Sequence, residues 1–222
     1  MKVIKCERKG GICRELMSCR RMEVVELAAQ IIQDGGLVVY PTDTLYGLGA
    51  DAFNAEAVGK VFEAKERPES VPISVAVADT VMLERVVRLN AWAAKVIEAL
   101  VPRPITFILP KKKVVPSTLT AGRDVVGVRI PNHMFALSVI SRTGPITTTS
   151  ANLHEGHDPR TIRSAIRQLG EAVDLYVDCG KAAFGKGSTV VDLSGGTPGK
   201  AKIVREGAAD PAEIKKVLAD IK

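Results

Sequence analysis

Apolar and polar positions alternate along this chain with two different periods, which predicts helices and strands in mixed order. From residue 23 to residue 34 apolar side chains recur at the spacing of a helix that buries one face, at Val24, Leu27, Ala28 and Ile31. The glycine pair at 35–36 predicts the end of this helix, because glycine accepts the left-handed conformation common at that position. The short apolar run that follows, residues 37–40, predicts a buried strand.

This alternation continues to the C-terminus. The predicted helices cover residues 23–34, 55–65, 80–87, 90–100, 132–141, 161–169 and 211–221. The predicted strands cover residues 3–6, 37–40, 73–77, 106–109, 125–130, 146–149, 175–177, 188–193 and 202–205. Elements mixed in this way indicate one α/β domain, and the neighbouring strands near 175 and 190 suggest that some pairing is antiparallel. We expect residues 1–22 to add a strand and a basic segment packed on the core, and residues 23–222 to form the domain itself.

The composition narrows the class of fold and of ligand. Hydrophobic residues make up 46% of the chain and aromatic residues only 4%, so the core must be built from Val, Ile, Leu and Ala, which favours an α/β fold. The net charge of +6 suits nucleic acids, nucleotides and other anions, although many basic proteins bind no nucleic acid. No apolar run approaches the roughly 20 residues of a membrane span, and the first residues do not form a signal peptide. We therefore expect a cytoplasmic protein that has no membrane partner.

Several common catalytic motifs are absent from the sequence. There is no HExxH, no GxSxG and no GxGxxG after a predicted strand. The spacing of Cys6, Cys13 and Cys19 does not match the CxxC pairs of zinc sites, so no protein-held metal is predicted. Residues 180–187 almost match a P-loop, but Gly187 replaces the Ser or Thr, and a strand is predicted where a P-loop needs a helix N-terminus. A P-loop NTPase is therefore excluded.

Polar side chains that could bind a ligand follow the strand at residues 37–40. The segment PTDTLYGLG places Thr42, Thr44 and Tyr46 there, with glycines that would let a ligand approach the backbone. In open α/β sheets ligands bind at the carboxyl ends of strands. The alternative is an ordinary turn in which Asp43 caps local amides.

Two cations lie where a helix gives way to an extended segment. Pro68 disfavours helical geometry at Arg67, so the helix should end there. Residues two apart in an extended segment point to the same side, so Lys65 and Arg67 could converge on one polyanion. The alternative is a solvated helix end whose charges interact with the helix dipole.

Other hydroxyls, amides and cations also stand at strand ends. The strand at 146–149 leads into Ser150 and Asn152, which could present a hydroxyl and an amide to phosphate or ribose but are also common in turns. A buried arginine at a strand end usually has a carboxylate or phosphate partner, which comes either from the protein or from a ligand. The arginines at predicted strand ends are Arg129 and Arg205, and the hydroxyl residues placed in the same way are Ser188 and Thr189.

Taken in order, these segments resemble the YrdC family, the threonylcarbamoyl-AMP synthases, from about residue 23 to residue 208. The resemblance rests on PTDTLYGLG, AKERP, VPRPITFILP, GVRIP, TSAN, GSTVVD and REG. It implies a twisted, mixed, open α/β sheet flanked by helices and bent around a concave basic cavity. It also implies the short, single-domain form of the family.

The resemblance further implies a reaction and its site. Threonine and bicarbonate would form a carbamate that attacks the α-phosphorus of ATP and releases pyrophosphate. The threonylcarbamoyl-AMP would pass to a transferase partner that modifies tRNA. ATP would be bound by Lys65, Arg67, Ser150, Asn152 and Arg205, and threonine by Thr44, Arg129, Thr148 and Ser188. Further candidates are Thr42, Tyr46, Thr149 and Thr189.

No side chain is assigned as catalytic, because the carbamate itself is the nucleophile. Mg²⁺ is expected as a companion of the triphosphate, without an organic cofactor. Arg103 stands where the family has a glycine between two prolines, and this predicts an extra cation near the cavity. The alternative function is a module that binds double-stranded RNA or tRNA without catalysis, which the charge supports, although the scarcity of aromatics argues against stacking on single strands.

Overall fold

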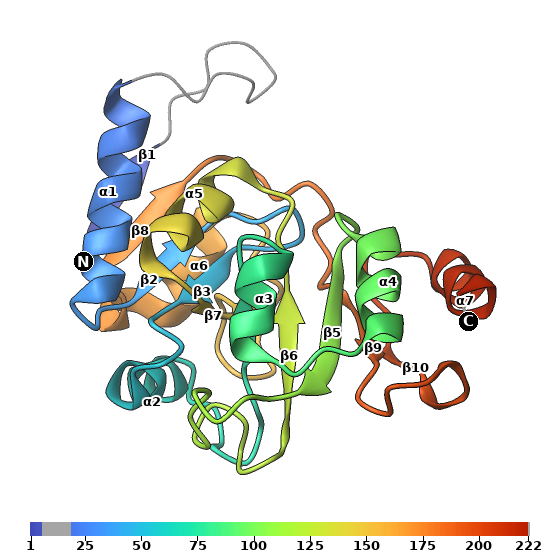
Figure 1. Cartoon of the computed structure of the whole chain (residues 1–222). Coiled ribbons are helices and arrows are strands. Elements are labelled where there is room, and N and C mark those ends of the chain that lie inside the picture. The colour runs from blue at the N-terminus through green and yellow to red at the C-terminus, as the bar shows by residue number, and fades with distance from the viewer. Residues whose placement is uncertain (6–18, 222) are drawn as a thin grey trace.

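The computed structural model describes residues 1–5 and 19–221, and the side chains of residues 19–21 are not part of that description. Within these residues one mixed sheet runs through the molecule, with helices packed around it (Figure 1). The strands are β1 (Lys2–Lys5), β2 (Val38–Tyr40), β3 (Gly47–Gly49), β4 (Ser74–Ala76), β5 (Ile105–Pro110), β6 (Val125–Arg129), β7 (Ile146–Ser150), β8 (Leu175–Asp178), β9 (Thr189–Asp192) and β10 (Lys202–Arg205). The α-helices are α1 (Cys19–Gln33), α2 (Ala55–Ala64), α3 (Thr80–Val86), α4 (Ala91–Leu100), α5 (Met134–Thr143), α6 (Ile162–Leu169) and α7 (Pro211–Asp220).

The strand order is β1-β8-β2-β3-β7-β4-β6-β5-β9-β10, with parallel and antiparallel neighbours. The pairs β1–β8, β2–β8, β4–β6 and β5–β9 are parallel, and the other pairs are antiparallel. The predicted mixed sheet is therefore confirmed. The strands near 175 and 190, however, are not partners: β8 and β9 lie toward opposite edges of the sheet, so antiparallel pairing arises elsewhere.

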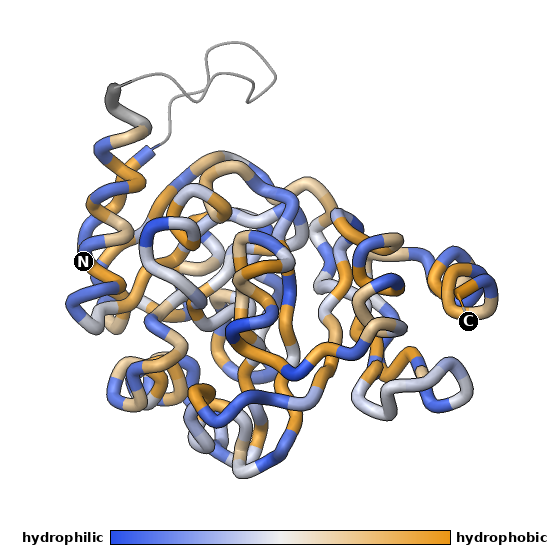
Figure 2. The backbone as a smooth tube through the Cα atoms, in the orientation of Figure 1, coloured by the Kyte–Doolittle hydropathy of each residue, from blue (hydrophilic) through white to orange (hydrophobic). Residues whose placement is uncertain are grey.

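Two apolar clusters hold the helices to the sheet. In the smaller cluster α1 and α5 pack on each other and on β2 and β8, through side chains such as Ala28, Ile32 and Val139. The larger cluster joins α2, α3, α4, α6 and α7 to the central strands. Figure 2 shows the alternation of apolar and polar positions along α1 that allows one face to be buried.

The predicted helices and strands all appear, with small shifts at their ends. Helix α1 begins at Cys19, four residues before the predicted start, and ends at Gln33, shortly before the expected stop at Gly35, where φ is +78°. Asp79 caps α3 by accepting a hydrogen bond from the amide of Met82. Residues 2–5 of the predicted N-terminal segment form the edge strand β1 beside β8. The basic segment after it, with Cys6 and Cys13, lies outside the described residues.

Strand β3 was not predicted, because a three-residue strand with two glycines has little strand propensity of its own. It forms because it pairs with β2 and β7 on its two sides. The glycines are needed for packing. A Cβ on Gly49 would lie 2.8 Å from the ring of Tyr40, and one on Gly47 would lie 3.1 Å from it.

Candidate active site

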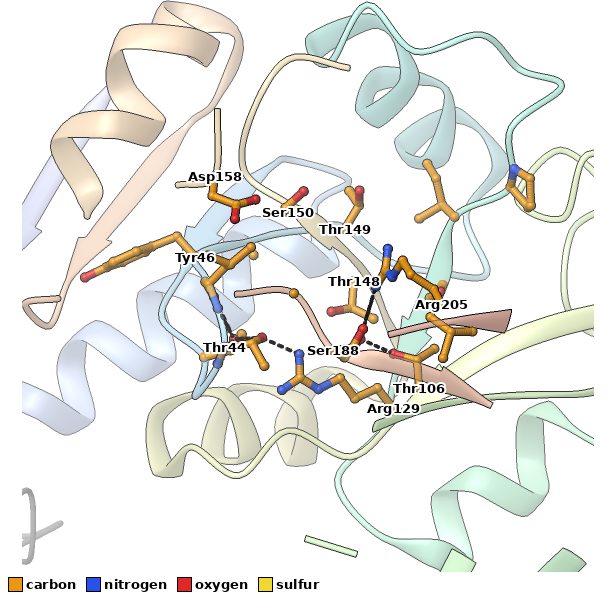
Figure 3. Close-up of a pocket in the computed structure, with 18 of the residues that line it drawn as sticks. Thr44, Tyr46, Thr106, Arg129, Thr148, Thr149, Ser150, Asp158, Ser188 and Arg205 are labelled. Carbon is orange, nitrogen blue, oxygen red and sulfur yellow. Dashed lines mark hydrogen bonds between the residues drawn. The ribbon is translucent and has the colours of Figure 1, made fainter. Parts of the chain in front are cut away.

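A cavity of about 270 Å³ opens between the loop after β2 and the middle strands of the sheet (Figure 3). Strand β4 pairs parallel with β6 and antiparallel with β7, so the carboxyl ends of β6 and β7 lie at opposite ends of β4. Arg129 ends β6 and Ser150 ends β7, and both line the cavity. The site therefore spans the face of the sheet. The expectation that it lies only where the carboxyl ends of strands meet is too narrow.

A network of threonine hydroxyls shapes the turn after β2. The Thr42 hydroxyl donates to the carbonyl oxygen of Leu45 at 2.6 Å and lies 3.0 Å from the Thr44 hydroxyl. The Thr42 oxygen also accepts hydrogen bonds from the amides of Thr44 and Leu45, at 3.2 and 3.3 Å, so it is fully engaged within the turn. Thr44 also accepts a hydrogen bond from Arg129 at 2.5 Å. The oxygen of Thr44 therefore keeps one lone pair that can accept a hydrogen bond from a ligand amine or hydroxyl.

Arg129 is fixed by a buried ion pair with Asp43. Its guanidinium donates to a carboxylate oxygen of Asp43 at 2.7 Å, and both side chains are almost fully buried. The same oxygen accepts a hydrogen bond from the amide of Asn132 at 3.2 Å. Burial lowers the pKa of Arg129, and the charge of Asp43 opposes that shift. The expected carboxylate partner of this arginine is thus internal, and Asp43 does not simply cap its own turn.

Two further arginines line the cavity. The guanidinium of Arg67 donates to the carbonyl oxygens of Val71 and Pro72, each at 2.9 Å. That of Arg205 donates to the carbonyl oxygen of Ser188 at 2.9 Å. In the described part of the chain neither arginine forms an ion pair. Both therefore keep a charge that an anionic ligand could neutralise.

These charges also act on one another. Burial lowers the pKa of Arg67, and the neighbouring charge of Arg205 lowers it further. Burial likewise lowers the pKa of Arg205, with Arg129 adding to the shift and Asp158 opposing it. Asp158 is the one carboxylate among the described residues that line the cavity.

A family model named Sua5_yciO_yrdC and described as "Telomere recombination" matches residues 30–207. The chain belongs to the Sua5/YciO/YrdC family. The threonylcarbamoyl-AMP synthase of Pyrococcus abyssi is 35% identical over 89% of this chain. This chain spans only 58% of the length of that relative.

Two solved structures extend the comparison. P. abyssi Sua5 complexed with L-threonine matches with a TM-score of 0.86 at 31% identity, covering 100% of this chain and 61% of that chain. E. coli YciO matches with a TM-score of 0.76 at 25% identity, covering 94% of this chain and 96% of that chain. These likenesses confirm the expected family and its fold.

The four residues expected to bind threonine in this Sua5/YciO/YrdC domain all line the cavity: Thr44, Arg129, Thr148 and Ser188. Thr148 accepts a hydrogen bond from the buried Tyr40 hydroxyl at 3.3 Å. Burial raises the pKa of Tyr40 to about 12, so this phenol stays protonated and remains the donor. Ser188 lies 2.7 Å from Thr106, hydroxyl to hydroxyl.

The five residues expected to bind ATP are divided. Arg67, Ser150 and Arg205 line the cavity, whereas Lys65 and Asn152 are not among the described residues that do so. The Lys65 ammonium donates instead to the carbonyl oxygens of Ser150 and Asn152. Burial, and then the charge of Arg67, lowers the pKa of Lys65 from 10.5 to about 7.

The further candidates also divide. Thr42, Tyr46 and Thr149 line the cavity, but the Tyr46 ring points away from it and its hydroxyl donates to the carbonyl oxygen of Gly180 at 2.6 Å (Figure 3). Thr189 does not line the cavity within the described residues. Its hydroxyl donates to the carbonyl oxygen of Ala209 at 2.8 Å and so ties β9 to the segment after β10.

The segment at 180–187 behaves as predicted for a sequence that is not a P-loop. It leads into strand β9 and not into a helix. The amides of Phe184 and Gly185 donate to the carbonyl oxygens of Asp43 and Thr44, each at 3.0 Å. These two amides hold the turn after β2 and are already engaged with protein oxygens.

Three polar residues of the cavity were missed by the sequence analysis: Ser74, Thr106 and Asp158. Ser74 and Thr106 lie near the amino ends of β4 and β5, which a search of carboxyl ends passes over. A polar residue in an apolar strand was the available signal for Thr106. Arg103, the extra cation expected near the cavity, is not among the described residues that line it, and its guanidinium pairs with Glu213 of α7 at 3.3 Å.

Proposed function

We propose that this chain is an L-threonylcarbamoyladenylate synthase, which converts ATP, L-threonine and bicarbonate into threonylcarbamoyl-AMP and pyrophosphate. The name of the P. abyssi relative and the solved complex of P. abyssi Sua5 with L-threonine support this reaction. One observation carries the proposal for this chain: two arginines that have no ion-pair partner among the described residues face a single cavity, together with a set of fixed hydroxyls.

The chemistry of the reaction fits such a lining. The amine of threonine adds to bicarbonate-derived carbon dioxide, and a carbamate oxygen then attacks the α-phosphorus of ATP. The new bond is from carbamate oxygen to phosphorus, and the bond between the α-phosphorus and the bridging oxygen breaks as pyrophosphate leaves. Both reactants are anionic, so the protein must supply positive charge and hold them in line. No side-chain nucleophile is required.

The proposed roles follow from where the side chains lie. Arg67, Ser150 and Arg205 would contact the nucleotide, since all three line the cavity. Thr44, Arg129, Thr148 and Ser188 would surround threonine. The acceptor lone pair of Thr44 suits the amine or the hydroxyl of that substrate.

Magnesium is proposed as a companion of the triphosphate. The described residues contain no cluster of three or more His, Cys, Asp or Glu side chains that could hold a metal by themselves. Magnesium in nucleotide sites is typically bound by one or two carboxylates together with phosphates. Asp158 is the carboxylate suited to this role here, where the ion would neutralise phosphate charge.

The same proposal places the chain in the cytoplasm, where it would hand the adenylate to a transferase that modifies tRNA. Among the helices described, none has the length and hydropathy to cross a bilayer.

The test is release of pyrophosphate from ATP by the purified chain. The proposal expects release that requires both threonine and bicarbonate, and that falls to background when either is left out. Pyrophosphate release that ignores threonine and bicarbonate contradicts it. Salt-sensitive binding of tRNA without any turnover would instead support the RNA-binding alternative.

A further inference from the structure

Lys65 lies in a buried cluster behind the wall of the cavity. Its side chain is 1% exposed, and its ammonium donates to the carbonyl oxygens of Ser150 and Asn152, both at 2.5 Å. The carbonyl oxygen of Lys65 in turn accepts a hydrogen bond from the amide of His154 at 2.8 Å. Two of the three ammonium donors are therefore engaged with the main chain at the end of β7 and just after it.

The same segment is also held by hydrogen bonds that do not involve Lys65. The side-chain amide of Asn152 donates to the carbonyl oxygens of Leu153 and Gly156, at 2.8 and 3.0 Å. The guanidinium of Arg67 approaches the imidazole of His154 at 3.3 Å. The turn at residues 150–156 is thus held between Lys65, Arg67 and its own Asn152, and it carries Ser150 into the cavity lining.

We infer that Lys65 is a positioning residue, which holds the turn at 150–156, and with it Ser150 and Arg67, in the arrangement that receives the nucleotide. It acts through the carbonyl oxygens it binds and does not contact the triphosphate. That the ligand is a nucleotide rests on the proposed function. That Lys65 keeps the turn at 150–156 in one conformation does not.

The titration of Lys65 agrees with this role. Burial and the charge of Arg67 lower the pKa of Lys65 to about 7, so a large fraction of this side chain is neutral in mildly alkaline solution. A neutral amine still has two N–H donors for its two carbonyl partners. It has lost the charge that a phosphate contact would need. A positioning role therefore survives deprotonation, and a phosphate contact does not.

The first experiment compares Lys65→Met with Lys60→Met in the full chain. Lys60 lies on α2, the helix that Lys65 caps at its C-terminal end. Its side chain is exposed, pairs with Glu56 and donates to the carbonyl oxygen of Gly35, and neither Lys60 nor Gly35 is among the described residues that line the cavity, so it is the matched control. The dissociation constants for ATP, ADP and AMP are measured by calorimetry. Loss of the two hydrogen bonds should weaken all three nucleotides by the same factor, about tenfold, while Lys60→Met changes none of them. A loss that grows with each added phosphate overturns the inference.

The second experiment needs no ligand. Amide hydrogen exchange in residues 150–156 should be at least about tenfold faster in Lys65→Met than in Lys60→Met, because two buried carbonyl oxygens lose their donor. Unchanged exchange in this turn overturns the inference. This result stands even if the wild-type chain binds no ATP, an outcome that would refute the proposed function alone.

Where Lys65→Met does not fold, the wild-type chain supplies the test. The ratio of its affinities for ATP and AMP is followed from about pH 7.5 to pH 9, where the nucleotide phosphates are almost fully deprotonated. A constant ratio supports the positioning role. If the affinity for ATP falls relative to that for AMP, by up to about tenfold per pH unit, a protonated Lys65 contacts the triphosphate. That result overturns the inference.

Discussion

At the scale of single residues, the buried pair of Asp43 and Arg129 fixes one end of the cavity. Replacing Asp43 by alanine leaves the guanidinium buried without its carboxylate. We expect Asp43→Ala to lower the free energy of unfolding by about 3 kcal/mol, because breaking one side of a buried pair strands the other charge. Urea denaturation measures this. The control is Glu26→Ala, which removes the more exposed pair with Arg142 and should cost less than about 1 kcal/mol. Equal losses of unfolding free energy in the two variants would contradict the stabilising role of the buried pair.

Thr44 offers a second residue-level prediction. Its oxygen accepts from Arg129 and keeps one lone pair for a ligand. Thr44→Val keeps the shape and removes that acceptor, so we expect the KM for threonine to rise about tenfold with the KM for ATP nearly unchanged. Thr44→Ser should restore the threonine KM. A rise confined to ATP would move Thr44 to the nucleotide end of the cavity.

Lys65 makes stability depend on pH in an unusual direction. Its pKa in the folded chain, about 7, lies below its ordinary value of 10.5, so the unfolded chain binds more protons between these two values. The free energy of unfolding must then rise with pH across this window, by about 1 kcal/mol from pH 7 to pH 8. Below pH 7 the full cost of burying a charged Lys65 is present. Thermal or urea unfolding of wild type and Lys65→Met isolates this contribution. A difference between the two that does not change with pH would contradict the lowered pKa.

At the scale of elements, strand β3 depends on glycines that make room for a neighbour. We expect Gly49→Ala to destabilise the fold by about 1–3 kcal/mol, since its Cβ would lie 2.8 Å from the Tyr40 ring. For Gly59, inside helix α2, an added Cβ would meet no described atom within 4 Å outside its chain neighbours and the backbone of its own helix. Gly59→Ala should therefore stabilise by up to about 1 kcal/mol through helix propensity. Urea denaturation of both variants should give opposite signs, and the same sign would refute this role of Gly49.

The same scale shows what periodicity could predict. Helices such as α4 and α7 and strands such as β10 follow from their apolar spacing and from local caps. Strand β3 could not be predicted, because its conformation comes from partners on β2 and β7 that lie far away in the sequence. The partners of β8 and β9 could not be predicted either, because pairing across a mixed sheet depends on the path of the whole chain.

At the scale of the whole molecule, the cavity is assembled from segments that the sequence separates widely. Strand-end patterns and a family resemblance were enough to find Thr44, Arg67, Arg129 and Arg205. They could not tell that Lys65 turns inward to the main chain, because that depends on how α2 packs against the end of β7. Asp158 was missed for a related reason: it stands in a loop without periodicity and reaches the cavity only through the fold.

The central claim is that this cavity joins threonine, a bicarbonate carbon and AMP. The most direct measurement is mass spectrometry of the nucleotide product formed from ATP, threonine and carbon-13 bicarbonate. We expect threonylcarbamoyl-AMP that carries the carbon-13 label, and no such product from Arg67→Ala. An intact chain that converts ATP without incorporating the labelled carbon, or that leaves ATP unchanged, would contradict the claim.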